Sequence, residues 1–431
     1  MSIEDIKKKG IVGAGGAGFP THIKLSSRPE YIIMNAAECE PLIHKDMALL
    51  NHFMDEVLDG FRTAMTLTGA SRGIIGIKSK HHHIIQLLQE KTNSQIQVQA
   101  IGDFYPAGDE ITLIQQTVNR IPQPGSLPIT VGCLVQNVET LYNIAAEKPV
   151  VDKFITVGGA VEEPLTVKVP VGTSYADLLS HFKITVSHYL PVSGGLMMGR
   201  LEKDLDQVVT KCTGGLVLLP SDHPCIAMYD RYSDPHNTVK IAKASCDQCS
   251  FCTELCPRYL LGYPVRPELA MRNRMFSHEE NTLYHAGNAF CCECNLCTLY
   301  SCPEGLDPKG ASVIEKMIIH QEKKEWQGLP VSLHPMMTYR KVPTKKLMQR
   351  LDILQYKDKG PLGDIKIQPS SVRIPLKQHT GSPAVPVVSE GQSVNRYDLI
   401  AEASGDVSAN IHASIDGKIE KITQKDIVIQ R

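Results

Sequence analysis

Residues 246–257 read CDQCSFCTELCP and residues 291–303 read CCECNLCTLYSCP, so two cysteine runs of closely similar spacing lie near the middle of the chain. Each run contains three cysteines in steps of three residues, and its last cysteine is followed by proline. A tight loop can place three sulfurs on three irons of one cluster, but it cannot also reach the fourth iron. The spacing predicts two 4Fe-4S clusters, which fits the concentration of nine of the thirteen cysteines between Cys246 and Cys302.

The two runs resemble those of bacterial two-cluster ferredoxins, in which three cysteines of a run hold one cluster and the fourth binds the other. The resemblance implies two crossed ligand sets. The first set would be Cys246, Cys249, Cys252 and Cys302, and the second would be Cys291, Cys294, Cys297 and Cys256. Cys292 is then the spare cysteine. Two structural zinc sites are the alternative, since paired Cys-x2-Cys elements also bind zinc, but two such runs that end in Cys-Pro favour iron-sulfur clusters.

The composition is that of an ordinary globular protein. The 431 residues have room for about three domains, and they are 42% hydrophobic and 21% charged, with a mean hydropathy of -0.13. A net charge of -1 removes any overall electrostatic argument for a nucleic acid partner. Residues 1–10 lack the apolar run of a secretory signal, and no apolar run approaches the ~18 residues of a membrane helix. We therefore expect a cytoplasmic protein with no membrane span, whose cysteines serve as metal ligands.

The pattern of apolar residues predicts a multidomain α/β protein. Short apolar runs alternate with helical patterns up to about Ala146, which is typical of an α/β domain with a mainly parallel sheet. β-branched residues with Gly and Pro punctuation follow, around one helical stretch. The predicted segments are an α/β domain at 1–150, a small strand-rich domain at 151–220, the cluster module at 240–316, a linker or surface wrap at 317–372, and a β-sandwich or barrel at 373–431.

A glycine loop, GAGGAGFP at residues 13–20, is followed by a cation at Lys24. Glycines let the backbone approach a phosphate or a flat ring, and exposed amides with a lysine supply the countercharge. Three more polar segments occur in the same domain: residues 35–41 (NAAECEP), 108–110 (GDE) and 136–140 (QNVET). Each alone reads equally as a tight turn, a loop or a helix cap. Together they indicate a ligand crevice, because polar groups at the carboxyl ends of strands line such crevices in open α/β sheets.

The four segments together resemble the FMN- and NADH-binding subunit of respiratory complex I, and more closely the related RnfC and PduS families. The resemblance implies that FMN lies on the glycine loop and the Asn-x-x-Glu segment, with NADH beside it. The residues that would contact FMN are Gly13, Gly15, Gly16, Lys24, Asn35, Glu38, Asp109 and Asn137; those that would face NADH are Phe19 and two catalytic glutamates, Glu40 and Glu110. It also implies that the strand-rich domain is a β-grasp domain of the soluble-ligand-binding type and that the last domain is a barrel-sandwich hybrid.

The order of the domains separates these relatives. In RnfC proteins the segment that resembles residues 373–381 precedes the flavin domain together with its barrel, whereas here both follow everything else. This order resembles the PduS family, which are cobalamin reductases associated with bacterial microcompartments. The implied route runs from NADH to FMN and through two 4Fe-4S clusters to cobalamin. The implied partners are cobalamin, a corrinoid enzyme or adenosyltransferase, and shell proteins, and the implied location is the cytoplasm, within or beside a microcompartment.

Two alternatives stay open at this point. Residues 120–128 lack the Lys and Phe that help to hold the dinucleotide in complex I, and Ser27 stands where a second stacking aromatic is usual. FMN is therefore better supported than NADH, and the chain could be an RnfC-like adaptor or subunit that feeds another reductase or a membrane complex. A shell-associated electron conduit would need only the clusters, and Glu40 and Glu110 would then be dispensable. The oligomeric state is not predicted.

Overall fold

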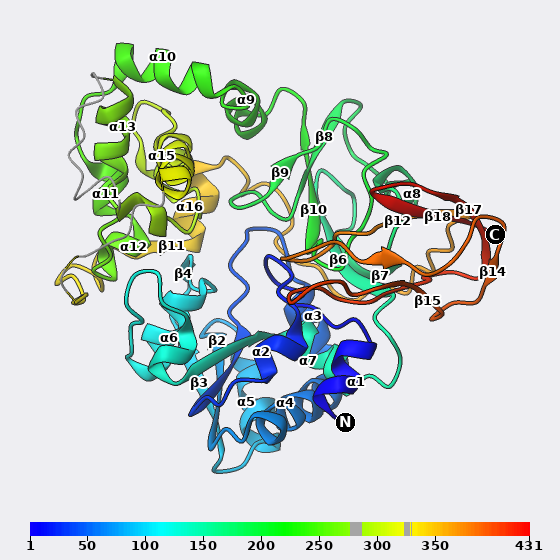
Figure 1. The fold of residues 1–431 in the computed structure, drawn as a ribbon. Helices are drawn as coiled ribbons and strands as arrows, with labels where there is room; N and C mark the ends of the chain where they lie inside the picture. Colours follow the sequence, from blue (N-terminus) through cyan, green and yellow to red (C-terminus); the bar gives the residue numbers. More distant parts are fainter. Residues whose placement is uncertain (276–286, 323–327, 329) are drawn as a thin grey trace.

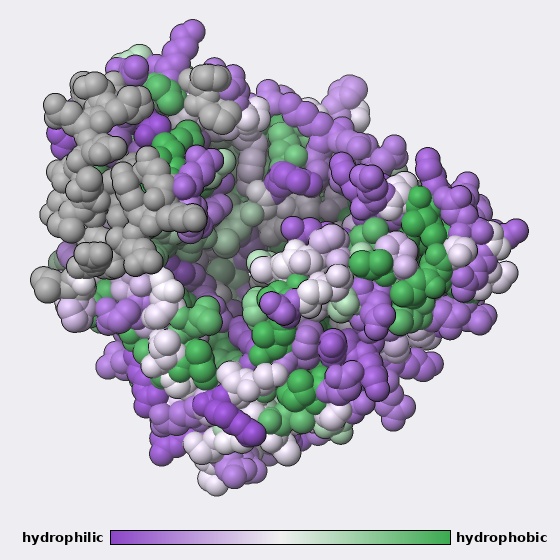
Figure 2. All heavy atoms as spheres, in the orientation of Figure 1, coloured by the Kyte–Doolittle hydropathy of each residue, from purple (hydrophilic) through white to green (hydrophobic). Residues whose placement is uncertain are grey.

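The computed structural model describes residues 1–275, 287–322, 328 and 330–431. We call residues 1–150 the N-terminal domain, 151–220 the central β domain, 221–322 the cluster module and 371–431 the C-terminal barrel. In Figure 1 the N-terminal domain lies at the bottom, the cluster module at the upper left and the C-terminal barrel at the right. Figure 2 shows a largely hydrophilic surface that is hollowed near the middle of this face.

A parallel sheet forms the centre of the N-terminal domain. Its strands are β1 (Tyr31–Ala36), β2 (Arg72–Lys78), β3 (Ile96–Ile101) and β5 (Cys133–Asn137), in the order β3-β2-β1-β5, and every neighbouring pair is parallel. Such strands are buried on both faces and therefore read as apolar runs. β1 follows this rule, since Ile32 and Met34 belong to the core on one face and Ile33 to the core on the other.

Helices cover both faces of this sheet. α4 (Met54–Thr68) and α7 (Val138–Ala145) pack on the face of Ile32, and α6 (Glu110–Val118) packs on the face of Ile33. The domain also contains α1 (Ile3–Lys8), α2 (Thr21–Leu25), α3 (Lys45–His52), α5 (His82–Lys91), the short strand β4 (Phe104–Tyr105) and the 3-10 helix η1 (Pro128–Val131). This layered arrangement leaves the carboxyl ends of the strands free to form a crevice.

The central β domain is a five-stranded mixed sheet with one helix. The strand order is β7-β6-β10-β8-β9, and only the β6–β10 pair is parallel. The elements are β6 (Asp152–Gly159), β7 (Leu165–Pro170), α8 (Tyr175–Ser180), β8 (Tyr189–Ser193), β9 (Arg200–Leu201) and β10 (Gly215–Pro220). Tyr175, Leu178 and Leu179 of α8 pack with alternate residues of β6, β7 and β10 in one core.

The cluster module is helical in its described part. Its elements are α9 (Pro224–Arg231), α10 (Pro235–Ser245), α11 (Phe251–Glu254), α12 (Pro257–Leu260), α13 (Pro267–Met275), the 3-10 helix η2 (Asn288–Phe290), the π-helix η3 (Cys297–Ser301) and α15 (Pro308–Glu322). Proline stands at the start of α12, directly after Cys256, where its missing N–H costs nothing. The segment predicted as a linker or wrap begins inside α15, so its first residues belong to the module.

The described residues beyond α15 bind the other parts of the molecule together. β11 (Val342–Pro343) pairs with β4 of the N-terminal domain, and α16 (Thr344–Arg350) follows it. Further along, Thr166 of the central β domain donates its N–H to Pro361 and accepts the N–H of Gly363. This segment therefore contacts both the N-terminal domain and the central β domain, and its Leu347 and Ile353 are fully buried.

The C-terminal barrel consists of two small antiparallel sheets around one apolar core. One sheet has the order β12-β18-β17-β14 and the other β13-β15-β16. The strands are β12 (Ser371–Pro375), β13 (Val385–Pro386), β14 (Ser393–Val394), β15 (Leu399–Glu402), β16 (Ile411–His412), β17 (Gly417–Ile422) and β18 (Asp426–Gln430). None of the helices in the described ranges is both long and apolar enough to cross a bilayer.

Candidate functional site

Two asparagines stand side by side at the carboxyl edge of the parallel sheet. Asn35 ends the apolar run of β1, and it pairs in register with Asn137 at the end of β5. The Asn35 Nδ2 donates to the carbonyl of Gly108 at 2.8 Å, which brings the 108–110 segment to this edge. The Asn137 Nδ2 donates to Asp46 at 2.8 Å, and its Oδ1 caps α7 by accepting the N–H of Glu139. Three of the predicted polar segments thus meet at the carboxyl edge of the sheet.

The glycine loop lies against the same edge. Ala14 donates its N–H to the Thr140 hydroxyl at 2.9 Å, so the base of the loop is fixed on α7. A Cβ at Gly15 would come within 2.7 Å of the Asn137 amide, so only glycine fits there. Gly16 faces open space, with no atom within 4 Å of an ideal Cβ, and residues 15–17 are exposed. A backbone that is open at its tip and anchored beside two amides fits a phosphate or a flat ring, as FMN requires.

Lys24 and Glu110 form an ion pair with 3.0 Å between Nζ and Oε1. Lys24 comes from α2, directly after the glycine loop, and Glu110 from the first turn of α6. Phe19, at the end of the loop, is 39% exposed. The structure thus brings Glu110 to the helix that follows the glycine loop.

Glu38 lies half-buried beside a group of buried charges, and its carboxylate accepts the N–H of Asp46 at 3.2 Å. Burial, with the nearby Asp46 carboxylate, raises the pKa of Glu38 to about 8. The Lys45 Nζ lies 2.5 Å from Asp46 Oδ1 and 3.3 Å from Glu139 Oε2. A second buried lysine, Lys153, also forms an ion pair with Glu139. Lys153 also donates to the carbonyl of Ala14 at 3.0 Å, which ties this group to the glycine loop.

Apart from Glu38, the members of this group were missed from the sequence. Glu139 lies in the quoted 136–140 segment, and an acid inside an apolar helix was the available signal. Lys45, Asp46 and Lys153 gave no such signal, because Lys153 starts a strand of another domain and only the fold brings it to α7. A buried charge is tolerated when it is paired and hydrogen-bonded, as these are.

Glu40 is held by the central β domain. Its carboxylate accepts the N–H groups of Met197 and Met198, each at 2.9 Å, and a Cβ at Gly195 would collide with it. Burial raises the pKa of Glu40 to about 7, although the two N–H donors oppose the shift. The predicted nicotinamide-side glutamate is therefore also a contact between two domains.

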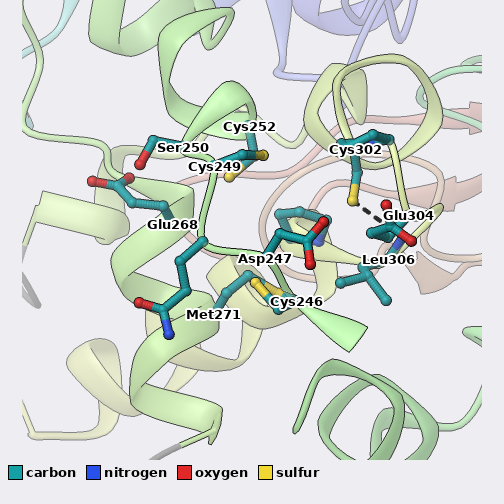
Figure 3. A pocket seen from close by; sticks show the side chains of 13 residues that line it. Cys246, Asp247, Cys249, Ser250, Cys252, Glu268, Met271, Cys302, Glu304 and Leu306 are labelled. Carbon is teal, nitrogen blue, oxygen red and sulfur yellow. Dashed lines mark hydrogen bonds between the residues drawn. The ribbon is translucent and has the colours of Figure 1, made fainter. Parts of the chain in front are cut away.

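Four cysteines line one cavity of the cluster module. They are Cys246, Cys249 and Cys252 of the first run and Cys302 of the second, the same four that the crossed pattern groups (Figure 3). The Cys302 sulfur accepts the N–H of Leu306 at 3.3 Å. Cys249 is exposed, so this cavity lies at the outer side of the module.

The other four cysteines are also neighbours. Burial and the adjacent thiols, Cys291 and Cys256 foremost, raise the pKa of Cys297 well above its ordinary value. Burial and the neighbouring thiol of Cys292 raise the pKa of Cys291 to about 12. Cys294 lies close to Cys256 and Cys297 as well. The structure therefore brings together both sets implied by the ferredoxin-like spacing.

The two runs share an unusual backbone. Positive φ angles occur two and four residues after the first cysteine in each run, at Gln248 and Ser250 in one and at Glu293 and Asn295 in the other. Non-glycine residues adopt this region rarely, so the coincidence indicates that both loops curl in the same way. Within the described residues no three His, Cys, Asp or Glu side chains converge on a single metal ion. A 4Fe-4S cluster does not require such convergence, because each of its four thiolate ligands binds a different iron.

The second set lies against the N-terminal domain. The Tyr105 hydroxyl donates to the carbonyl of Cys294 at 2.7 Å, and Arg258 forms two hydrogen bonds of 2.7 and 2.8 Å with the Asp109 carboxylate. Ile111 of α6 shares an apolar cluster with Cys256. Asp109 therefore joins the domains, and its contact with FMN stays a prediction.

The fold and the site together define an iron-sulfur flavoprotein built for electron transfer. Residues 6–146 match the family model of the Nuo51 FMN-binding domain, residues 245–307 match the 4Fe-4S dicluster domain, and residues 355–431 match the RnfC barrel sandwich hybrid domain. The α/β multidomain class and the FMN and 4Fe-4S cofactors predicted from the sequence are thereby confirmed. The barrel model begins before the predicted boundary at residue 373.

Curated relatives identify the family. The chain is 37% identical over 434 residues to the cobalamin reductase PduS of Salmonella typhimurium and 36% identical to that of Citrobacter freundii, in each case over 99% of this chain and 96% of the relative. It is 32% identical over 269 residues to one component of the proton-translocating ferredoxin:NAD(+) oxidoreductase complex of Clostridium ljungdahlii, over 59% of this chain and 55% of the relative. The chain belongs to the PduS family, as the sequence resemblance implied.

Proposed function

We propose that this chain is an NADH-dependent cobalamin reductase. NADH would be oxidised to NAD+ and one proton, and its two electrons would reduce cobalt from Co(III) to Co(II) and then to Co(I). FMN supplies the conversion of an electron pair to single electrons when it is bound, and 4Fe-4S clusters carry those electrons one at a time. The observation that carries the proposal is the contact of the second cysteine set with the domain that holds the glycine loop.

The chain's own residues would position the flavin. Gly13, Gly15, Gly16 and Lys24 would surround its phosphate or ring, and Asn35, Glu38, Asp109 and Asn137 would line the floor. The open tip at Gly16 and the anchored base at Ala14 support this assignment. Lys153, which donates to the Ala14 carbonyl, would hold the loop in the shape that the ligand needs.

The nicotinamide would be received beside the loop. Phe19 is exposed enough to stack on it, and Glu110 lies at the same side through its ion pair with Lys24. Glu40 would complete this side while its carboxylate stays fixed by Met197 and Met198. We assign these three residues to NADH, and the two glutamates among them to orientation of the hydride donor.

The two cysteine sets would act in a defined order. Cys256, Cys291, Cys294 and Cys297 would hold the cluster that receives electrons first, because Tyr105 and Ile111 of the N-terminal domain contact this set. Cys246, Cys249, Cys252 and Cys302 would hold the outer cluster, because Cys249 reaches the surface. The outer cluster would then deliver electrons to the corrin.

Partners and location follow from the proposed activity. We expect cobalamin or a corrinoid protein, such as an adenosyltransferase, to receive the electrons. We further expect a location within or beside a bacterial microcompartment, with shell proteins as neighbours. Pull-down with shell proteins from cells that express a microcompartment would test this expectation.

The activity is tested with anaerobically purified protein that contains flavin and iron. NADH should bleach the flavin without any partner, and added cob(III)alamin should then be reduced in single-electron steps. Flavin bleaching distinguishes an enzyme from an adaptor. Failure of the fully loaded protein to reduce cobalt would contradict the proposal.

A further inference from the structure

A second cavity, of about 250 Å³, lies in the cluster module and is lined by residues of α9, η3 and α15. Tyr229 and Tyr232, in and just after α9, form one wall, and Ile314 and Met317 of α15 form another. The buried Thr298 of η3 also lines it. Both tyrosine hydroxyls are engaged, Tyr229 with the Leu196 carbonyl at 2.8 Å and Tyr232 with the Gly305 carbonyl, so the two rings are fixed.

This cavity and the outer cysteine cavity share a wall. Leu306 and Pro308 line the cysteine cavity, and Leu306 is seen there beside Cys302 in Figure 3. The intervening Asp307 and the next residue, Lys309, line the second cavity instead. A molecule in the second cavity would therefore lie one chain thickness from the outer cluster. Such a short separation is what electron transfer between two bound groups requires.

Two polar groups of the cavity have no side-chain partner among the residues that the structure describes. Asn295 is only 8% exposed, and its Oδ1 accepts no hydrogen bond from any residue in the described part of the chain. Lys309 is half-buried and forms no ion pair with any described residue. Asp307 differs, since its carboxylate accepts from Thr238, Thr298 and the N–H of Gly310. A buried acceptor without a donor calls for an explanation, and a bound ligand supplies one.

We propose that this cavity is the docking site of the corrin substrate, an inference that rests on the function proposed above. A cobalamin has a methyl-rich macrocycle, peripheral amides that donate hydrogen bonds, and one anionic phosphodiester in its nucleotide tail. The aromatic and methionine walls fit the macrocycle edge, the Asn295 Oδ1 fits an amide donor, and Lys309 fits the phosphodiester. Ligand pockets usually measure about 300–1,000 Å³. The cavity therefore takes one edge of the corrin, and the rest stays outside.

Two variants of the full holoprotein test the site. Ile314→Phe fills the cavity, and Lys309→Glu reverses its charge; Lys243→Glu, at an exposed position of α10, is the matched control. We expect each cavity variant to weaken cobalamin binding about tenfold or more in anaerobic equilibrium dialysis, with iron and flavin contents like those of the wild type. The control should bind like the wild type.

A second probe separates the charge contact of Lys309 from the apolar contact of the cavity wall. Cobinamide has the corrin ring and amides but lacks the nucleotide phosphodiester, so Lys309→Glu should weaken cobalamin binding and leave cobinamide binding unchanged. Ile314→Phe should weaken both. If both loaded variants bind cobalamin like the wild type, the docking site is wrong and the proposed function stands. If the wild type neither binds nor reduces cobalamin, the proposed function itself fails.

Discussion

The Glu40 carboxylate accepts two backbone N–H groups from the central β domain, and its raised pKa of about 7 gives it a proton near neutral pH. In the unfolded chain the pKa of a glutamate is about 4.3. The folded protein therefore binds this proton more tightly than the unfolded chain does. Its contribution to stability is fully present below the unfolded pKa and is lost as the pH rises through about 7.

Glu40→Gln removes this titration. Between pH 5 and pH 8 the wild type should lose this contribution to stability, whereas the variant has none to lose. We therefore expect the difference in melting temperature, variant minus wild type, to increase by about 2 °C or more over this range. Differential scanning calorimetry at matched ionic strength measures it. Glu110→Gln is the control, because Glu110 is 40% exposed in its pair with Lys24. Parallel melting curves for Glu40→Gln and the wild type across this range would show that the carboxyl titrates normally.

The crossed cysteine sets make a prediction at single residues. Cys256→Ser and Cys302→Ser should each lower the iron content from about eight to about four per chain, because each removes one ligand of a different cluster. With Cys256→Ser, NADH should fail to reduce the remaining cluster, since the one beside the N-terminal domain is lost. With Cys302→Ser the remaining cluster should still be reduced, as followed by electron paramagnetic resonance.

Cys292→Ser is the matched control for these variants. It lies in the same run but outside both sets, so the iron content should stay at about eight per chain. Loss of a cluster in this variant, or reduction of the remaining cluster in Cys256→Ser at the wild-type rate, would mean that the sets or their order are assigned wrongly.

At the scale of elements, α6 and α12 meet through one ion pair. Asp109 caps α6 by accepting the N–H of Thr112, and the same carboxylate binds Arg258, the second residue of the one-turn helix α12. Both side chains are nearly buried, at 13% and 10% exposed. Removing one partner of such a pair typically costs about 3–5 kcal/mol, because the other charge is left buried and alone. This contact therefore sets how the cluster module sits on the N-terminal domain.

Arg258→Met should separate the two halves of the route. We expect NADH to reduce the flavin at the wild-type rate, while the clusters are reduced about tenfold more slowly or not at all, as measured by stopped-flow absorbance. The conservative variant Arg258→Lys keeps the charge but loses the two-point contact, so it should fall between. Cluster reduction at the wild-type rate in Arg258→Met would show that the contact is not needed for transfer.

At the scale of the whole molecule, the C-terminal barrel closes on the beginning of the chain. Lys211 donates its Nζ to the carbonyls of Gly10 and Asn410, at 2.7 and 2.9 Å, and so joins three parts of the molecule. Thr380 of the barrel donates to the Ala17 carbonyl at 2.8 Å. Gly18, at φ +71°, has the Cys212 sulfur and the Gln378 carbonyl within 2.9 Å of an ideal Cβ. The barrel thus buttresses the glycine loop from outside.

Lys211→Met should loosen this junction, because it leaves the buried Gly10 carbonyl and the part-buried Asn410 carbonyl without this donor, at about 1–3 kcal/mol for the buried one. We expect faster amide hydrogen exchange in residues 378–410 and in the glycine loop, and weaker retention of FMN on dialysis, while iron content stays unchanged. Lys425→Met, at an exposed position of the barrel, is the control. Unchanged exchange in both segments would show that Lys211 does not hold the barrel.

The same contact is compatible with a barrel at either end of the chain, as the resemblance to RnfC proteins implies. Residues 8–18 touch residues 378–410 directly, so the junction forms whichever segment comes first. Cutting and rejoining a chain at surface sites is tolerated when the contacts within the fold are kept. The position of the barrel in the sequence therefore identified the family, and its position in space is what serves the site.

Local chemistry in the sequence was enough for the cysteine runs, the glycine loop and the strands with their turns. Thiolate spacing depends on a short loop, and apolar runs depend on burial, so both can be read without a fold. Only the tertiary structure showed three contacts. Arg258 donates to the Asp109 carboxylate, the Glu40 carboxylate accepts the N–H of Met197, and Lys153 donates to the Ala14 carbonyl of the glycine loop. These pairs are separated by more than a hundred residues, and in each of them the burial of a charge, with its need for a partner, arises only after the domains have packed.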